Sequence, residues 1–255
     1  MRFGLCADIR NVLEVQAAGY DYIEGKLNQF ALWSDEEFES VLELFSSAEI
    51  KMETVSLLLP KSMTVIGDKF SKVELMTFLD RAFARMDALD SKLVVFGSGK
   101  SRNRPENMPY GAAFRRLAEV ARLTGKIAAK YGLTIALEPL DGEETNIINT
   151  ASEGFRWVRN LDLPYVRILP DLFHMAMEKE DPNVLVQNEN LIVHLHASEA
   201  PGRVFPGKFG GEYLKKCGEV LRSFGWTKDI TVECVFSDFE SEADMALKFM
   251  KEAFE

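Results

Sequence analysis

The stretch LIVHLHASEAPGR, residues 191–203, decides the fold because it ends an apolar run with a pair of histidines. The chain has only three histidines, and His194 and His196 are two of them. Side chains alternate along a strand, so both imidazoles are expected to point to the same face. We interpret His194 as a hydrogen-bonded core residue. His196 lies one step nearer the end of the strand and is the candidate ligand.

Short apolar runs alternate with longer segments of helical period along the chain, which is the pattern of repeated strand–helix units and a parallel sheet. The predicted strands are residues 3–6, 20–23, 54–59, 93–96, 134–138, 166–170, 191–196 and 230–235. The clearest predicted helices are residues 35–48, 72–89, 110–131, 211–224 and 242–253, and residues 181–189 form a weaker candidate. Ser34, Ser71 and Thr150 each precede a glutamate by three residues, as in a capping box.

Eight such units in 255 residues predict a (β/α)8 barrel, an α/β fold, formed as a single domain over residues 1–255. No linker or composition break divides the chain. The alternative is an open, doubly wound sheet, which usually carries a glycine-rich turn after its first strand. The sequence CADIRNV has no glycine at that point.

Composition and charge narrow the functional classes. A formal net charge of −10 disfavours nucleic acid as a partner, because it would repel a phosphate backbone. No apolar run reaches the about 18 residues of a membrane helix, and no signal peptide is recognisable. The three cysteines form no C-x-x-C pair, so we expect reduced thiols. Without a membrane helix or a signal peptide we expect a cytoplasmic enzyme, and the acidic charge favours a small polar substrate. The sequence is compatible with a homodimer or a homotetramer and does not choose between them.

Each of the last four strand units ends in a group that can bind a metal. These groups are Glu138, Asp171, His196 and Glu233. Ligand bonds of about 2.0–2.3 Å require the four side chains to converge, whereas the outer strands of a flat four-stranded sheet lie roughly 15 Å apart. Only a closed sheet brings them together, so the metal site and the barrel support one another.

For Glu138 or Glu233 alone, the simpler interpretation is a strand-end carboxylate that faces solvent or pairs with a basic loop residue. Both follow apolar strand residues, however, and an acid inside a buried run is costly unless it is paired or metal-bound. Cys234, next to Glu233, is expected to point to the opposite face as a small buried residue.

The part of the chain from the fourth to the eighth strand resembles the xylose isomerase-like superfamily of sugar isomerases and epimerases, and within it the ketose 3-epimerases of the tagatose and psicose type. The matching segments are VVFGSG, LEPLDGEETN, DLFHM, HLHASEAPGRVFPG and VEC. The resemblance implies the same four metal ligands, Glu138, Asp171, His196 and Glu233. It also implies a substrate pocket lined by Glu144, His174 and Arg203.

The ligand set itself indicates the chemistry. Three carboxylates and one imidazole are hard, oxygen-rich ligands that suit Mn2+ best, with Mg2+ or Co2+ as alternatives. Such an ion stabilises the enediolate that forms when a ketose loses the proton next to its carbonyl, and Glu138 and Glu233 would flank the sugar as acid and base. Two carboxylates that serve one reaction need environments that push their pKa values apart. The predicted activity is therefore that of a metal-dependent ketose epimerase or isomerase.

Other functions stay open at this point. Family epimerases often carry Asn-Arg where this chain has Asp141-Gly142, which leaves epimerisation, aldose–ketose isomerisation and inosose dehydration as reaction types. A non-catalytic sugar-binding relative and a barrel endonuclease are more remote alternatives. The endonucleases use three-metal centres, which need more than three histidines.

Two further segments indicate anion binding. GSGKSRNR places Lys100 and Arg102 after the fourth strand, and GKFGGEY places Gly210 and Gly211 at the start of the helix that follows the seventh. Backbone N–H groups at a helix start bind phosphate in many barrels. The alternative is that the basic residues pair with acids on the surface.

Overall fold

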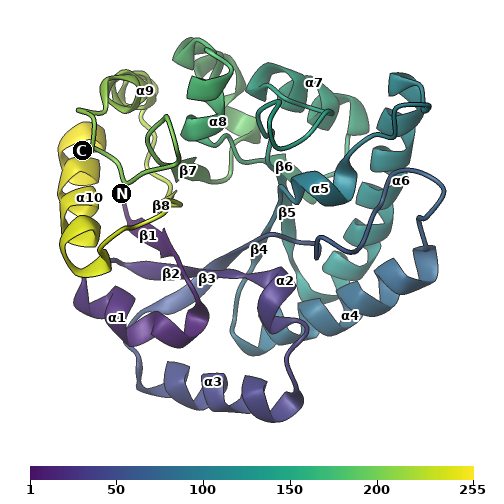
Figure 1. The fold of residues 1–255 in the computed structure, drawn as a ribbon, viewed down its shortest axis with the longest axis horizontal. Helices are drawn as coiled ribbons and strands as arrows, with labels where there is room; N and C mark the ends of the chain where they lie inside the picture. Colours follow the sequence, from purple (N-terminus) through teal and green to yellow (C-terminus); the bar gives the residue numbers. More distant parts are fainter.

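The computed structural model describes residues 1–255 and shows eight parallel strands surrounded by helices (Figure 1). The strands are β1 (Phe3–Cys6), β2 (Tyr22–Lys26), β3 (Lys51–Ser56), β4 (Leu93–Phe96), β5 (Thr134–Leu137), β6 (Val166–Ile168), β7 (Leu195–Ala197) and β8 (Ile230–Val232). Neighbouring strands pair from β6 back to β1, then β1 pairs with β8 and β8 with β7. Isolated parallel bridges join Ile168 to Ile192 and Asp171 to His196, so the β6 side of the sheet also meets the β7 side. The predicted (β/α)8 barrel is confirmed.

Ten α-helices surround the strands. They are α1 (Val12–Ala17), α2 (Leu27–Phe30), α3 (Asp35–Ser47), α4 (Lys72–Ala88), α5 (Gly99–Arg102), α6 (Tyr110–Ala128), α7 (Ala151–Leu161), α8 (Leu172–Met177), α9 (Glu212–Ser223) and α10 (Phe239–Phe254). The five clearest predictions are confirmed to within three residues at either end. The weaker candidate at 181–189 is not an α-helix, because the chain there forms two short 3-10 turns, Pro182–Val184 and Val186–Leu191.

The predicted helix caps are present, but only one is a full capping box. Ser34 accepts a hydrogen bond from the N–H of Glu37, and the Glu37 carboxylate accepts one from the N–H of Ser34. Thr150 accepts from the N–H of Glu153, whose carboxylate instead accepts from the N–H of Asn149. At α4, Ser71 accepts from the N–H of Glu74 without the reciprocal bond. The reciprocal pairing is therefore confirmed at α3 and wrong at α4 and α7.

Three strands begin and end away from their predicted places, and the difference at the second matters for the site. The seventh strand, predicted at 191–196, is β7 at Leu195–Ala197. The prediction ended the second strand at residue 23, but β2 continues through Glu24 to Lys26. Tyr20 does not belong to the strand, because its side chain is buried outside the ladder and its hydroxyl donates to the carbonyl of Ala243. The third strand was predicted at 54–59 but ends at Ser56, because Leu57 adopts a left-handed backbone with φ of 54°.

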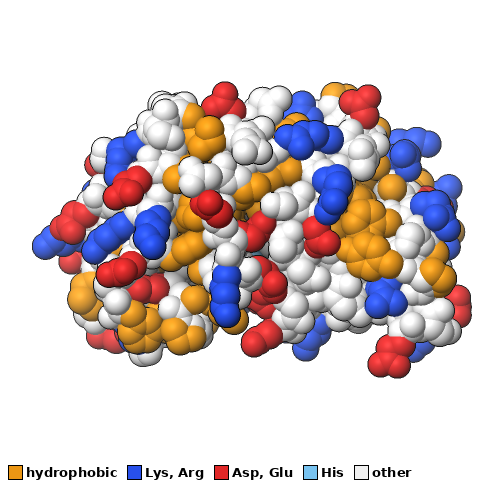
Figure 2. All heavy atoms as spheres, turned by 90° about the horizontal axis from the view of Figure 1, so that it is seen from above, with side chains coloured by type: hydrophobic (Ala, Val, Ile, Leu, Met, Phe, Trp, Pro, Cys, Tyr) orange, Lys and Arg blue, Asp and Glu red, His pale blue; other side chains and the backbone are white.

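Charged side chains of both signs are exposed on the surface (Figure 2). On the face drawn in Figure 2, basic and acidic side chains are interspersed, with apolar side chains between them. This face therefore lacks the continuous basic stripe that a phosphate backbone requires. None of the helices combines the length and the apolar character needed to cross a bilayer. All three cysteines are free, and Cys234 is half-buried rather than buried as expected.

The contact between α9 and α10 yields a prediction about stability. Gly218 is buried in α9, and a Cβ built on it would lie 2.1 Å from the backbone oxygen of Ala253 in α10. We expect Gly218→Ala to lower the free energy of unfolding by about 1–3 kcal/mol, because the helices must move apart. Gly111→Ala in α6 is the control, since its Cβ would meet only Arg115 Nη1, 3.6 Å away. Urea denaturation of both variants measures the difference, and equal stabilities would contradict this account of the packing.

Candidate active site

Four side chains at the ends of β5, β6, β7 and β8 converge at the C-terminal end of the barrel. Glu138 follows β5, Asp171 lies three residues beyond β6, His196 lies within β7, and Glu233 follows β8. One ligand atom from each lies within 4.8 Å of all the others. We call these four residues the acidic cluster. Their convergence is as the sequence predicts, and their role as metal ligands stays a prediction.

Local structure holds the carboxylates of the acidic cluster in place. Asp171 caps α8, because its Oδ1 accepts from the N–H of Phe173 at 2.8 Å and its Oδ2 stays directed to the cluster. Gly97, at the end of β4, leaves room for Glu138, since a Cβ there would lie 2.0 Å from Glu138 Oε2. Any larger residue at position 97 would have to displace that carboxylate.

His196 is completely buried, and both of its ring nitrogens face carboxylates. Nδ1 lies 3.2 Å from Glu138 Oε1 and 3.0 Å from Glu233 Oε2. Nε2 lies 2.8 Å from Oε1 of Glu24 in β2. Burial by itself lowers the pKa of an imidazole, but the negative charges of Glu24 and Glu233 outweigh it and raise the pKa of His196 well above its ordinary value.

The two candidate catalytic glutamates lie in different electrostatic environments. Burial raises the pKa of Glu138, and the nearby His196 only partly offsets that effect. Glu233 is also desolvated, but the positive charges of Arg203 and His196 outweigh burial and lower its pKa. The pKa values thus move in opposite directions, as the sequence analysis expects for two carboxylates that serve one reaction.

Arg203 and His174 lie at the edge of the acidic cluster. Arg203 Nη1 donates to Glu233 Oε2 at 2.8 Å, and Nη2 donates to Asp171 Oδ2 at 2.9 Å. Nη2 also lies 2.7 Å from His174 Nε2, while His174 Nδ1 lies 2.6 Å from Asp141 Oδ2. Because a guanidinium has no acceptor, this arrangement makes His174 Nε2 the acceptor and Nδ1 the donor.

Glu144 joins this edge from the loop after β5. Its carboxylate, with Asp141 and His174, forms a second group whose ligand atoms all lie within 4.8 Å of one another. Glu144 is exposed, whereas the other two are buried. The structure therefore brings all three predicted substrate residues, Glu144, His174 and Arg203, to one side of the acidic cluster. Their contact with a substrate stays a prediction.

Glu24 is the residue that the sequence analysis missed. Its fully buried carboxylate contacts both histidines of the LIVHLHA stretch, with Oε1 at 2.8 Å from His196 Nε2 and Oε2 at 3.3 Å from His194 Nε2. Thr54 and Thr231 also donate to Oε2, at 2.9 and 2.7 Å. The signal was available, because Glu24 is an acid inside an apolar run, the criterion that singled out Glu138. The predicted strand ended at residue 23, one residue too early for this criterion to be applied to Glu24.

This contact explains why the histidines come as a pair. Glu24 accepts the Nε2 proton of His196, which leaves Nδ1 facing the acidic cluster. His194 is a buried, hydrogen-bonded core residue, as interpreted from the sequence, since its Nε2 also contacts Thr231 Oγ1 at 2.8 Å. Glu24, His194 and His196 form a further group whose ligand atoms lie within 4.8 Å of one another.

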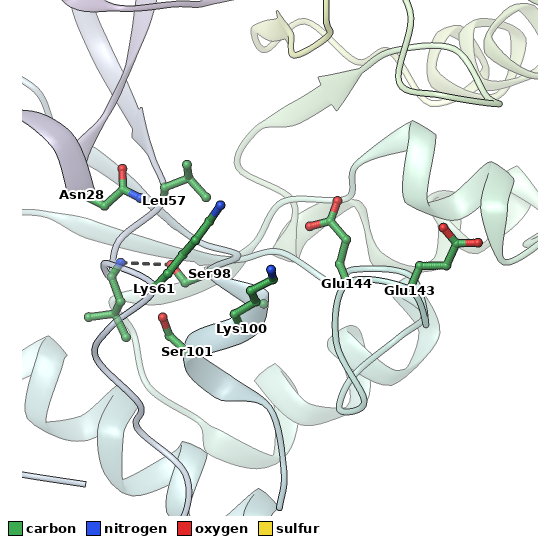
Figure 3. A pocket seen from close by; sticks show the side chains of 10 residues that line it. Asn28, Leu57, Lys61, Ser98, Lys100, Ser101, Glu143 and Glu144 are labelled. Atoms are coloured by element: carbon green, nitrogen blue, oxygen red, sulfur yellow. Dashed lines mark hydrogen bonds between the residues drawn. The ribbon is translucent and has the colours of Figure 1, made fainter. Parts of the chain in front are cut away.

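A cavity of about 330 Å³ lies among the loops that follow β2, β3, β4 and β5. Figure 3 shows Lys61, Lys100 and Glu144 among the side chains that line it. Ser98 and Gly99 form part of its wall directly after Gly97, which packs against Glu138. We call this space the loop cavity, and part of its wall lies next in the chain to the glycine that packs against Glu138.

Of the predicted anion-binding residues, only Lys100 lines the loop cavity. Arg102 is completely buried and donates to the carbonyls of Phe96 and Glu138 at 3.1 and 2.7 Å, so it ties β4 to β5. Burial lowers the pKa of Arg102 to about 10.

The predicted anion site at the start of α9 already holds a carboxylate of the protein. Glu199 Oε1 accepts from the N–H of Gly211 at 2.7 Å, and Oε2 accepts from the N–H groups of Gly207 and Phe209. The N–H of Gly210 donates to the carbonyl of Gly207. These internal partners correct the expectation of anion binding at Arg102, Gly210 and Gly211.

Residues 12–253 match the model of the xylose isomerase-like TIM barrel family. The chain belongs to this family. Within it, the chain is 31% identical to D-psicose 3-epimerase of Ruminiclostridium cellulolyticum over 121 residues, 47% of this chain and 41% of that protein. The match spans less than half of the length of three curated relatives, all named as epimerases.

Solved structures of the xylose isomerase-like type share the whole fold. A crystal structure of D-psicose 3-epimerase in the presence of D-fructose superposes with a TM-score of 0.86 at 20% identity, covering 100% of this chain and 99% of that one. A structure of the protein IolI with a zinc atom superposes with a TM-score of 0.75 at 19% identity, covering 99% and 96%.

The contact between Glu24 and His196 yields a prediction about metal affinity. We expect Glu24→Gln to weaken Mn2+ binding by about 10–100-fold, because His196 loses the charged acceptor that fixes its ring and its proton. Titration calorimetry measures the affinity. Thr54→Val is the control, since it removes a hydrogen bond to Glu24 Oε2 and leaves Oε1 with His196. A folded Glu24→Gln protein that binds Mn2+ as tightly as the control would contradict the assignment.

Proposed function

We propose that the protein is a divalent-metal-dependent enzyme that epimerises a ketose, with a proton exchanged between Glu138 and Glu233. The observation that carries this proposal is the acidic cluster, placed at the end of the barrel where enzymes of this fold have their active sites. Relatives named D-psicose 3-epimerase and probable ketose 3-epimerase support the choice of reaction.

The residues of the acidic cluster fit a divalent cation. Three carboxylates and one imidazole are the donors that Mn2+, Mg2+ or Co2+ accept, and we propose Mn2+. Arg203 supplies one positive charge against these three carboxylates, so a doubly charged ion completes the charge balance. Gly97 leaves the space that the Glu138 carboxylate occupies within the acidic cluster. When bound, the cation polarises the ketose carbonyl and stabilises the negative charge that develops as the adjacent carbon loses its proton.

Glu138 and Glu233 are the groups that move the proton. They reach the common centre from β5 and β8, and His196 Nδ1 contacts both. A sugar bound between them presents its C3 hydrogen to one carboxylate and the opposite face of C3 to the other. One carboxylate removes the C3 proton, and the other, protonated from solvent, delivers a different proton to the opposite face, which inverts the configuration at that carbon.

Arg203, His174 and Glu144 orient the sugar in this proposal. The guanidinium of Arg203 offers donors at the boundary between the cluster and the solvent, and it is itself fixed by Asp171 and Glu233. Glu144 provides an exposed acceptor beside His174. Hydroxyl groups need both donors and acceptors, so this edge is suited to bind several hydroxyls of one sugar.

Product analysis in deuterated water tests the reaction type. With Mn2+ present and a panel of ketohexoses and ketopentoses, an epimerase yields a new C3 stereoisomer that carries deuterium at C3. An aldose as product would show that the enzyme is an aldose–ketose isomerase. Loss of water would show a dehydratase. Either of these products would overturn the proposed epimerisation and keep the metal-dependent proton transfer.

Removal of either carboxylate should abolish turnover. We expect Glu138→Gln and Glu233→Gln each to lower kcat by at least about 10²–10⁴-fold, because an amide can neither accept nor return the proton. Glu106→Gln is the control, as Glu106 is an exposed residue outside the site. Steady-state kinetics on the accepted ketose measure the loss. A near-native rate in either active-site variant would exclude the two-glutamate mechanism.

Removal of the metal should affect stability as well as turnover. Treatment with a chelator is expected to abolish activity and to lower Tm, because a cation that binds only the folded state stabilises it by about 2.7 kcal/mol at 100 times its Kd. Added Mn2+ should restore both properties. Thermal unfolding followed by circular dichroism, with and without Mn2+, provides the measurement. An unchanged Tm together with full activity after chelation would exclude a bound divalent cation.

A further inference from the structure

The loop cavity carries two cationic side chains that the proposed proton transfer does not use. Lys61 follows β3 and Lys100 follows β4, and Figure 3 shows both side chains extending into the same space. The lysines of this chain that form ion pairs are Lys92, Lys130 and Lys208, so neither cavity lysine has a carboxylate partner. Both lysines are exposed, and Glu143 and Glu144 line the same cavity without forming an ion pair with either of them. The two ammonium groups therefore stay available to a negative ligand.

The two loops that carry these lysines are tied together next to them. Ser101 Oγ donates to the carbonyl of Pro60 at 3.0 Å, which links the neighbour of Lys100 to the neighbour of Lys61. The N–H of Leu59 donates to Ser98 Oγ, also at 3.0 Å. The lysines therefore extend from backbones at a fixed separation, which lowers the entropy lost when both bind one group.

The backbone of the cavity wall is strained at two non-glycine residues. Leu57 has φ of 54° and Ser98 has φ of 43°, and both line the cavity. A non-glycine residue with a positive φ costs free energy, and this backbone conformation persists only where the surrounding structure enforces it. Such residues are common at binding sites. The hydrogen bond between Leu59 and Ser98, and another from the N–H of Asn28 to the carbonyl of Leu57, enforce them here.

The cavity also contains an acceptor without a donor. The side-chain oxygen of Asn28 is buried and has no hydrogen-bond partner, although Asn28 lines the cavity. A buried amide oxygen left unpaired costs free energy that a ligand hydroxyl would recover. The cavity thus presents two cations suited to an anionic group, and the Asn28 oxygen would serve a ligand hydroxyl once a small movement exposes it.

The position of the loop cavity defines which part of a ketose would occupy it. Gly97, which leaves room for the Glu138 carboxylate, directly precedes Ser98 and Gly99 of the cavity wall. A sugar whose carbonyl end lies at the acidic cluster would therefore extend its other end toward Lys61 and Lys100. Figure 3 shows Glu143 and Glu144 on one side of the cavity and Lys61 and Lys100 on the other, which separates the acidic wall from the cationic wall.

We propose that the loop cavity selects ketoses that carry a phosphate or a carboxylate on the carbon farthest from the carbonyl, with Lys61 and Lys100 binding that group. The inference rests on the proposed function, because the reacting end of the same sugar is held by the acidic cluster. Both anions share the chemistry that two ammonium groups recognise. Binding of either anion in the loop cavity would define the class of substrate that the proposed reaction uses.

Pairs of substrates that differ only in their terminal group test the proposal with the Mn2+-loaded protein. D-Fructose and D-fructose 6-phosphate, D-tagatose and D-tagatose 6-phosphate, and D-ribulose and D-ribulose 5-phosphate form the phosphate arm. D-Fructuronate provides the carboxylate arm. For the sugar skeleton that is accepted, we expect kcat/KM to be at least about tenfold higher for the anionic member, mainly through KM. Comparison of the phosphate arm with the carboxylate arm shows which of the two terminal groups the cavity selects.

Variants show whether the lysines cause the preference. Lys61→Met and Lys100→Met should each lower the ratio of anionic to neutral kcat/KM by about tenfold. Lys216→Met in α9 is the matched control and should leave the ratio unchanged, since Lys216 is an exposed lysine far from the cavity lining. A wild-type ratio near one, or a ratio that both cavity variants leave unchanged, would overturn the proposal while the proposed function stands.

A binding measurement tests the anion site separately from catalysis. If no ketose is turned over, that result counts against the proposed function alone, and the binding measurement still decides whether the cavity binds an anion. Calorimetric titration of the Mn2+-loaded protein with inorganic phosphate should show binding that Lys61→Met and Lys100→Met weaken by about tenfold each. Binding that resists both substitutions would show that phosphate is held elsewhere. That result, or the absence of phosphate binding to the wild type, would overturn the anionic assignment.

Discussion

Burial of negative charge around His196 is the constraint on which the rest of the site depends. Glu24, Glu138 and Glu233 all direct an oxygen to this one imidazole, and Asp171 lies within the same cluster. Carboxylates removed from water are stable only beside positive charge or hydrogen-bond donors. Arg203, the two histidines and two threonines supply part of what is needed, and the remaining imbalance is what makes this end of the barrel suitable for a divalent ion.

The same residues lie where the barrel closes. Between β6 and β7 the sheet is joined by isolated bridges, one of which connects Asp171 to His196. Two backbone hydrogen bonds join the β6 side to the β7 side. The N–H of His196 donates to the carbonyl of Pro170 at 3.3 Å, and the N–H of Val193 donates to the carbonyl of Ile168 at 3.1 Å. A cation held by Asp171 and His196 would add a connection across this seam. The pairing that closes the barrel at this seam therefore also brings Asp171 and His196 together.

The two halves of the barrel mouth differ in chemistry. The ends of β5 to β8 gather the carboxylates and His196, which suits proton transfer. The loops after β2 to β5 enclose a cavity with Lys61, Lys100 and the unpaired oxygen of Asn28, which suits recognition. Gly97 lies at the boundary, where the absence of a side chain lets the Glu138 carboxylate and the cavity wall approach one another. A single sugar placed across this boundary would meet both.

The sequence by itself determined the features that depend on local periodicity. The alternation of apolar runs with capped helical segments was sufficient for the barrel, and the polar residues at strand ends were sufficient for the four members of the acidic cluster. It also indicated that His194 is a core residue, because a strand directs His194 and His196 to the same interior. These conclusions need only the positions of neighbouring residues along the chain.

Only the tertiary structure decided which groups meet across the barrel. Glu24 is 172 residues from His196 in the chain, and nothing local to either shows that they share a proton. Arg102 and Gly211 fit an anion site by sequence, yet one binds two backbone carbonyls and the other binds Glu199, because the closed sheet brings those acceptors within reach. Lys61 lies in the segment between the predicted strand 54–59 and the predicted helix 72–89, which the sequence left unassigned. Its place beside Lys100 is set by hydrogen bonds between two loops. Contacts of this kind depend on the path of the folded chain, which local residue preferences do not encode.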